Sequence, residues 1–197
     1  MITTIIFDCF GVLTTDGWLP LKRELFGNTG ENYEAATELN RQFNAGVLNY
    51  GGFTSQIARL SGMNEADVRT RLEANVPNEP LLAYIGAGLV GSYKIGMLSN
   101  AGTDRPKRLF TPEQIAYFNA IALSHETGFN KPEIGAYQTI AGRLTSAPDE
   151  CLFIDDQPAF CTGAEDAGMQ TLCFADPETL VTRLQERLLQ DTNQPRN

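Results

Sequence analysis

The sequence predicts an α/β fold, in which a Rossmann-like, doubly wound parallel sheet carries a small inserted helical cap. Five short apolar runs have the length and composition of buried strands. Helix-like segments alternate with these runs from residue 78 onward, which is the pattern of parallel βαβ units. The segment between the first two runs has no strand pattern. We therefore expect a core domain over residues 1–14 and 79–197, and a cap over residues 15–78.

The strands and helices of the core follow from apolar periodicity and from turn and capping residues. The predicted strands are residues 4–10, 93–98, 120–123, 151–154 and 171–174. Thr111-Pro112-Glu113-Gln114 combines an N-cap, a proline at the first helical position and a Gln that completes a capping box. Helices are predicted over residues 80–90, 132–144 and 157–167, with two more opening at Thr111 and Asp176. The polar tail, residues 190–197, is expected to fray.

The segment 15–78 is predicted to be all-helical because its apolar residues recur at helical spacing and glycines separate the runs. The expected helices cover residues 20–26, 32–44, 53–60 and 65–74. The first strand precedes this segment, and the rest of the sheet follows it. The segment is therefore predicted to be an insertion into the core rather than a separate N-terminal domain.

Charge and composition exclude several classes of partner. The net charge is −9, with only 15 Lys and Arg, so a basic surface for nucleic acid or for anionic lipid is not expected. No apolar run approaches the roughly 20 residues that span a bilayer. The four cysteines have no metal-ligand spacing, and three lie in or beside apolar stretches. We expect reduced thiols and a cytoplasmic protein, with the oligomeric state left open.

Acidic, hydroxyl and amide side chains recur at the carboxyl ends of the predicted strands, and a lysine lies in the loop that follows the third. In a doubly wound sheet these ends meet at the crevice where ligands bind. The residues are Asp8, then Ser99 and Asn100, then Lys131, and then Asp155 and Asp156. Each also has an ordinary structural explanation: a strand-end turn for Asp8, a local turn for Ser99-Asn100, a solvated helix start for Lys131, and an N-cap pair for Asp155-Asp156.

Taken together, these residues indicate chemistry on a phosphate group. Clustered carboxylates repel one another unless a cation lies between them, and an oxygen-only ligand set suits magnesium (Mg²⁺). Lys131 offsets the negative charge on the other side. Ser99 and backbone N–H groups near Gly11 and Asn100 are candidates to hold phosphoryl oxygens. An aspartate such as Asp8 can attack phosphorus and form an aspartyl-phosphate.

This ordered set resembles the haloacid dehalogenase-like (HAD) superfamily of hydrolases over almost the whole chain. Four stretches carry the resemblance: IIFDCFGVL, GMLSN, GFNKPEIGAY and FIDDQPAFCTGAEDAGM. The resemblance implies Asp8 as nucleophile, Ser99 as phosphate-binding residue, Lys131 as anchoring lysine, and Asp155 and Asp156 as the metal-binding pair. The helical insert resembles the cap of the subgroup that includes dehalogenases, sugar-phosphate phosphatases and the N-terminal domain of soluble epoxide hydrolase.

The resemblance implies a phosphatase that acts on a small phosphorylated metabolite through an aspartyl-phosphate at Asp8. Phe10 departs from the pattern, because most phosphatases of the family carry a second Asp there as the general acid and base. Phe10 keeps the backbone carbonyl that this position lends to the metal, but its side chain transfers no proton. We therefore expect slow catalysis. Three ways to tolerate the missing acid stay open: a substrate with a good leaving group, a water, or another protein group, for which His125 and Asp16 are the candidates.

Two other functions stay open. Haloacid dehalogenases carry a Tyr at the position of Phe10, which favours carbon-centred hydrolysis, although their fourth motif is typically not a doubled acid such as Asp155-Asp156. A protein that keeps the fold and has lost catalysis would instead be a binding or regulatory module. Three aromatic residues of the insert have two predicted uses, in a substrate pocket or in cap-core packing: Trp18, Tyr50 and Phe53.

Overall fold

A computed structural model of the chain describes residues 1–174 and 176–192. Its centre is a sheet in the order β3-β2-β1-β4-β5, and each neighbouring pair is parallel. The strand order reverses on either side of β1, so β1 lies at the switch point of a doubly wound sheet. The strands are β1 (Thr4–Phe7), β2 (Lys94–Ser99), β3 (Ala120–Leu123), β4 (Cys151–Asp155) and β5 (Gln170–Cys173).

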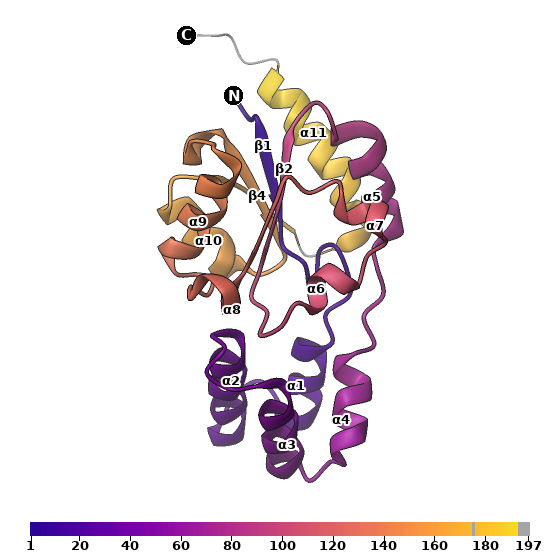
Figure 1. Cartoon of the computed structure of the whole chain (residues 1–197), viewed down its shortest axis with the longest axis vertical. Coiled ribbons are helices and arrows are strands. Elements are labelled where there is room, and N and C mark those ends of the chain that lie inside the picture. The colour runs from indigo at the N-terminus through magenta and orange to yellow at the C-terminus, as the bar shows by residue number, and fades with distance from the viewer. Residues whose placement is uncertain (175, 193–197) are drawn as a thin grey trace.

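Helices cover both faces of the sheet, so alternate residues of β1 enter two different cores (Figure 1). Ile6 packs beneath α9 (Ile134–Leu144) and α10 (Pro158–Asp166). Ile5 and Phe7 enter the opposite core, which receives side chains from three other segments. These are α5 (Glu79–Tyr84), the π-helical turn η1 (Ile85–Leu89) and α11 (Leu180–Thr192).

Short helical turns complete the connections of the core. The capping box predicted at Thr111 is present, because the Thr111 and Gln114 side chains each accept the other's backbone N–H. The short helices are α6 (Arg105–Arg108), α7 (Pro112–Ile115), α8 (Ser124–Thr127), η2 (Pro148–Glu150) and η3 (Pro177–Thr179).

Four helices between β1 and β2 form a separate bundle, α1–α4. Figure 1 shows it beyond the end of the sheet at which β1 finishes. The bundle buries its own apolar cluster around Leu21, Phe53 and Ile57. Asn49 and Asn64 cap α3 and α4 by accepting backbone N–H groups. The bounds are α1 (Trp18–Phe26), α2 (Glu31–Asn44), α3 (Tyr50–Ser61) and α4 (Glu65–Leu72).

Some predicted boundaries are wrong, for local reasons. The first strand ends at Phe7 and not at residue 10, because the chain turns at Gly11, whose φ is +102°. The predicted helix over residues 80–90 ends at Tyr84 and continues as the turn η1, which contains two glycines. The tail does not fray from residue 190, since α11 runs to Thr192; residues 193–197 lie outside the described residues.

None of the helices in the described part of the chain has the length and apolar character needed to cross a membrane.

Candidate active site

A buried lysine joins two carboxylates at the end of the central strands. Lys131 Nζ lies 2.6 Å from Asp8 Oδ1 and 2.6 Å from Asp155 Oδ2. The three side chains are 1%, 5% and 0% exposed, respectively. Because β1 and β4 are paired in register, the residues that follow them emerge side by side. The structure therefore brings together Asp8, Lys131 and Asp155, as the strand-end pattern predicts.

Asn100 fixes the backbone of the lysine. Its side-chain Oδ1 accepts the Lys131 N–H at 2.7 Å, and its Nδ2 donates to the Lys131 carbonyl at 3.0 Å. The loop after β3 is thereby attached to the end of β2. Asn100 lines the cavity described below, but its amide group is already used in holding Lys131. It is a positioning residue in this geometry, and the sequence did not indicate that task.

Asp156 completes a group of three carboxylates. One oxygen each of Asp8, Asp155 and Asp156 lie within 4.8 Å of one another. Gly11 makes room for this arrangement, since a Cβ at Gly11 would lie only 2.7 Å from Asp156 Oδ2. The Gly11 N–H donates to the Thr14 carbonyl at 2.7 Å, so the use of this amide to hold a phosphoryl oxygen, as the sequence suggested, conflicts with the structure. Gly11 contributes space rather than a donor.

The electrostatics of the group are those of a cation site. Burial raises the pKa of Asp8, and the charges of Asp155 and Asp156 add to that effect, while Lys131 opposes it. Burial, followed by the charges of Asp155 and Asp16, raises the pKa of Asp156 to about 6. Asp156 Oδ1 is buried and has no hydrogen-bond partner among the described residues. Three oxygen ligands and an unsatisfied buried oxygen fit a hard divalent cation such as Mg²⁺.

Ser99 lies at the carboxyl end of β2, beside β1. It is 1% exposed, and its hydroxyl oxygen has no hydrogen-bond partner among the described residues. Ser99 does not contribute to the wall of the cavity defined below. An unpartnered buried hydroxyl at this position agrees with a phosphate-binding role, which stays a prediction.

A cavity of about 720 Å³ opens from the carboxylate group toward the bundle. Asp8, Phe10 and Lys131 contribute to its wall on the core side. The Phe10 side chain is half-buried, and it brings an apolar surface to the position where the family resemblance implies an acid. The cavity is therefore large enough for a drug-sized molecule, and of the three carboxylates Asp8 lines it, whereas Asp155 and Asp156 do not contribute to its wall.

The bundle supplies an aromatic wall. Trp18, Tyr50 and Phe53 all line the cavity, and Phe43 joins them. Phe43 stacks on Phe53 with ring centroids 4.9 Å apart, and Trp18 meets Phe53 edge-on at 5.2 Å. Trp18, Phe43 and Tyr50 also pack on the cluster around Phe53 in the bundle core. The two uses predicted for the aromatic residues of the insert thus combine, because the same rings fill the bundle and face the cavity.

Four charged residues of the wall were missed by the sequence analysis: Lys22, Glu73, Arg105 and Arg108. Lys22 falls on the inner face of α1, four residues from both Trp18 and Phe26. A cation on the apolar stripe of an amphipathic helix is a sequence signal that could have identified Lys22 as a site residue. Arg105 gave no such signal. It donates to the Glu73 carbonyl and to Asn75 Oδ1, which attaches the exit of the bundle to the loop after β2.

Of the two candidate replacement acids, Asp16 lies on the cavity wall and His125 does not. The Asp16 carboxylate accepts the N–H groups of Trp18 at 2.7 Å and Leu19 at 3.2 Å, so it caps α1. Burial raises the pKa of Asp16, and these two hydrogen bonds oppose the shift.

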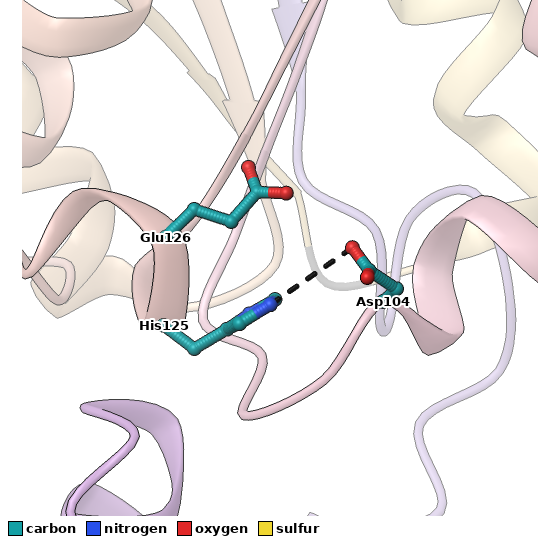
Figure 2. A group of neighbouring side chains, drawn as sticks. All are labelled: Asp104, His125 and Glu126. Atoms are coloured by element: carbon teal, nitrogen blue, oxygen red, sulfur yellow. Dashed lines mark ion pairs between the residues drawn. The ribbon is translucent and has the colours of Figure 1, made fainter.

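His125 belongs to a second cluster, with Asp104 and Glu126, drawn in Figure 2. Its Nδ1 is 2.8 Å from the Ala101 carbonyl, and its Nε2 lies 3.9 Å from Asp104. Lys107 pairs with Asp104 at 2.9 Å and with Glu126 at 2.5 Å. The lysine balances both carboxylates, so the cluster is a surface ion-pair network.

Comparisons of the chain with known families and sequences give two matches. The family model described as haloacid dehalogenase-like hydrolase matches residues 2–168. Flavin mononucleotide hydrolase 1, a chloroplast protein of Arabidopsis thaliana, is 34% identical over 71 residues. That similarity covers 36% of this chain, and the chain spans only 29% of the relative's length.

Solved structures share the fold over most of the chain. A predicted HAD-like family hydrolase from Porphyromonas gingivalis has a TM-score of 0.71 at 23% identity, covering 95% of this chain and 98% of that one. A HAD family enzyme from Bacteroides thetaiotaomicron, solved with magnesium and inorganic phosphate, gives 0.66 at 22% identity, covering 88% and 94%. An L-2-haloacid dehalogenase from Xanthobacter autotrophicus gives 0.62 at 18% identity, covering 99% and 85%.

Proposed function

The chain belongs to the haloacid dehalogenase-like hydrolase family, as its motifs indicated, and from this premise we propose that it is a phosphatase. One observation carries the proposal. Three carboxylates and a buried lysine, Asp8, Asp155, Asp156 and Lys131, converge beside an open cavity. The proposed substrate is a small phosphorylated metabolite, bound with its phosphate at this group.

The relatives support this choice in different ways. The Arabidopsis relative is named a flavin mononucleotide hydrolase, and the Bacteroides enzyme was solved with magnesium and phosphate together. In this chain we propose Asp8, Asp155, Asp156 and the carbonyl of Phe10 as the residues that hold Mg²⁺. The ion supplies positive charge to the transferring phosphoryl group when bound. The doubled acid Asp155-Asp156 favours this ion and therefore disfavours dehalogenase chemistry, which the family also contains.

The proposed reaction has two steps at Asp8. The Asp8 carboxylate attacks phosphorus, the bond from phosphorus to the substrate oxygen breaks, and an aspartyl-phosphate forms as the alcohol leaves. Water then attacks the aspartyl-phosphate and releases inorganic phosphate. Lys131 stabilises the charge on the phosphoryl oxygens, and Ser99 offers its unpartnered hydroxyl. Asn100 holds Lys131 in place.

The leaving oxygen needs a proton that Phe10 cannot give. We propose that Asp16 supplies it, because Asp16 lies on the same cavity wall outside the group of three carboxylates. Burial raises its pKa, which favours the protonated form that an acid requires. Glu73 also lines the cavity, but it accepts the Tyr50 hydroxyl and is 45% exposed. Asp16 is therefore the better candidate.

The bundle α1–α4 is the proposed cap, spanning residues 15–78 between two parts of the core. It supplies the aromatic wall while the core supplies the carboxylates, so substrate would be enclosed between the two layers. Enclosure excludes water from the transferring phosphoryl group and lets the cap select the leaving group. The cytoplasmic location stays a prediction.

The decisive test is hydrolysis of para-nitrophenyl phosphate with Mg²⁺ and with EDTA, by the natural chain and by Asp8→Asn. This ester has a good leaving group and places no demand on an acid. We expect Mg²⁺-dependent turnover that falls by at least about 10³-fold in Asp8→Asn. Asp67→Asn is the matched control, since Asp67 is exposed on α4 away from the cavity.

Three outcomes separate the alternatives. Turnover lost in Asp8→Asn alone supports the phosphatase. Turnover that survives Asp8→Asn means that another group does the chemistry and contradicts the proposal. Absence of turnover by the natural chain also contradicts it. Halide release from a 2-haloacid would then identify a dehalogenase. No activity on either substrate would favour a binding or regulatory module without catalysis.

A further inference from the structure

Lys22 is a buried cation without a carboxylate partner. The residue is 6% exposed, and none of the acidic side chains in the described part of the chain lies within 4.0 Å of its ammonium nitrogen. Its one hydrogen bond goes to Thr37 Oγ1 at 3.1 Å. An ammonium group has three donors, so two of them have no acceptor among the described residues.

The surroundings of Lys22 balance its charge only at a distance, because Asp16, whose burial-raised pKa the Lys22 charge partly lowers, lies beyond ion-pair distance. The ammonium nitrogen lies 4.1 Å from the centroid of the Tyr33 ring and 6.0 Å from that of Trp18. These rings attract the cation but carry no net charge. The Thr37 hydroxyl donates to the Tyr33 carbonyl, so it can accept from Lys22 without competing for a proton. A lysine this deeply buried is normally paired.

Lys22 also lines the cavity, on the side that the bundle supplies. Thr37 and Asn40 of α2 lie on the same wall, whereas Asp8 and Lys131 lie on the core side. Thr37 is exposed, so this part of the wall is near solvent. The rings of Trp18, Phe43 and Phe53 line the same cavity from the bundle, and the Phe10 ring lines it from the core. The wall therefore offers one cation from the core, one cation from the bundle, and aromatic rings to the same bound molecule.

We propose that Lys22, with Thr37 and Asn40, forms a second anion-binding subsite, and that the substrate is an aryl-bearing phosphate ester with a second negative group remote from the phosphate. This proposal rests on the phosphatase function and adds the class of leaving group. The ligand's anion supplies the counter-charge that the protein lacks at Lys22. The aromatic wall holds the flat body by stacking. Specificity then comes from the bundle, while the reaction stays in the core.

The test compares pairs of synthetic esters that differ only in a carboxylate. Phenyl, naphthyl and biphenyl phosphates are each made with and without a carboxylate on the ring carbon furthest from the phosphate. The three pairs place the carboxylate at increasing distance, so the series does not depend on one assumed length. kcat/KM is measured for each pair with the natural chain, Lys22→Met, Lys22→Arg and Arg59→Met. Arg59 is exposed on α3 and outside the cavity, and its variant controls for loss of one positive charge from the bundle.

We expect at least one carboxylate ester to exceed its uncharged partner by about 10- to 100-fold in kcat/KM, which is the usual gain from a buried charge-assisted hydrogen bond. The gain should disappear in Lys22→Met, persist in part in Lys22→Arg, and persist fully in Arg59→Met. Using the ratio within each pair removes any general loss of activity. No gain with any pair, or an unchanged gain in Lys22→Met, overturns the subsite.

The uncharged esters test the phosphatase separately. If they and the carboxylate esters are not hydrolysed, the phosphatase proposal fails, and the subsite is then judged by binding. Calorimetry with the three hydroxyaryl carboxylates, which are the alcohols of the same esters, measures Kd without any reaction. Binding of one of them that weakens by at least about 10-fold in Lys22→Met and not in Arg59→Met supports the subsite. Equal affinity in both variants contradicts it.

Discussion

Two lysines are buried among the residues that the structure describes, and their surroundings differ. Lys131 in the core lies 2.6 Å from each of two carboxylates, and Asn100 holds its backbone at both polar atoms. Lys22 in the bundle is almost as buried, 6% exposed against 3%, but has one hydroxyl as its hydrogen-bond partner and two aromatic rings nearby. The core neutralises its own cation, whereas the bundle leaves its cation for a ligand.

The difference separates two tasks that share one cavity. The group at Asp8 must be preorganised, since the reacting atoms gain most from charges that are already in place. The wall of the bundle must instead discriminate among leaving groups, and an unbalanced charge discriminates because a ligand that lacks the counter-charge leaves it unpaired. The comparison predicts opposite responses to equivalent substitutions in the two regions.

The largest expected effect comes from Lys131→Met. Removal of this lysine leaves the Asp8 and Asp155 carboxyl groups buried without their cation, and breaking a buried pair in this way costs about 3–5 kcal/mol. We expect a drop of that size in the free energy of unfolding, measured by urea titration in EDTA at pH 7.5, together with loss of phosphatase activity. Lys107→Met is the matched control, because Lys107 also pairs with two carboxylates but is 37% exposed.

The control should lose no more than about 1 kcal/mol, as exposed ion pairs do. A loss at Lys131 as small as that at Lys107 would show that the carboxylates of the core take up protons or solvent freely. The core site would then resemble the surface network, and the contrast between the two regions would fail.

The second prediction concerns proton donation from the bundle side. Asp16→Asn has nearly the same shape and removes the acidity, but its one oxygen can replace only one of the two acceptors, which are Oδ1 for the Trp18 N–H and Oδ2 for the Leu19 N–H. We expect turnover of an alkyl phosphate, whose leaving group needs a proton, to fall by about 10²-fold, which is the lower end of general acid catalysis. Turnover of para-nitrophenyl phosphate should change by no more than about 3-fold, since its leaving group is stable as an anion.

Equal losses of turnover on both esters in Asp16→Asn would assign Asp16 a structural role in α1 instead.

A second variant tests whether a carboxyl group at position 10 can replace Asp16. Phe10→Asp, made in the Asp16→Asn background, places a carboxyl group on the core side of the cavity, and we expect it to restore part of the turnover of the alkyl phosphate. Failure to restore any turnover, in a folded variant, would show that position 10 does not reach the leaving oxygen.

The sequence predicted the core site well because its residues follow strand ends in a fixed order. Once β1 and β4 pair in register, Asp8 and Asp155 must meet, and Asn100 then holds the loop that brings Lys131 to them. The strands and the helical insert were predicted for the same reason, since apolar periodicity reports burial directly. Boundaries were less accurate where the backbone alone decides, as at the turn after Phe7 and in the π-helical turn after Tyr84.

The rest of the site depends on contacts that no local pattern encodes. The sequence suggested a backbone N–H near Asn100 as a phosphate donor, which stays a prediction, but it did not indicate that the Asn100 side chain holds Lys131, a partner 31 residues away in sequence. Gly11 was predicted as a donor and instead provides space for Asp156. Lys22 faces the cavity only because α1 and α2 pack as they do. Such roles arise from packing between segments far apart in the chain.

The third prediction uses the same substitution as the first, in the other region. Lys22→Met removes a buried charge without a carboxylate partner and fills its space with an apolar side chain of similar length. We expect the free energy of unfolding of the ligand-free protein to rise by about 1 kcal/mol, since the loss of the Thr37 hydrogen bond and of the ring contacts offsets part of the gain. Urea titration under the conditions used for Lys131→Met gives the direct comparison.

A fall of more than about 1 kcal/mol would mean that the rings around Lys22 stabilise it fully, and the bundle would not need a ligand's charge. Arg59→Met is again the control for net charge. Its free energy of unfolding should change by less than about 0.5 kcal/mol, as for an ordinary surface substitution.

The smallest expected effect tests the part of the core site that the protein leaves unbalanced. Asp156 has an unpartnered buried oxygen, and its pKa is raised from 3.8 to about 6, so the folded state binds the proton more tightly than the unfolded state does. Without metal, Asp156 therefore reduces stability as pH rises from about 4 to about 6, and the full penalty persists above that window. Asp156→Asn does not ionise and should escape this penalty.

The side chain is partly solvated, so the penalty is discounted to about 1 kcal/mol, which is about 2–4 °C in Tm for a chain of this size. In EDTA we expect the two chains to have equal Tm near pH 4 and the variant to lead by that amount at pH 7. Addition of Mg²⁺ should reverse the order, because the natural chain then gains a ligand that the variant binds less well. A Tm difference between the two chains that stays constant across the pH range would mean that the protein itself compensates the Asp156 charge, as Lys131 does for Asp155. A bound cation would then add no stability through Asp156. The Lys22 ammonium would still be the buried charge that a ligand neutralises.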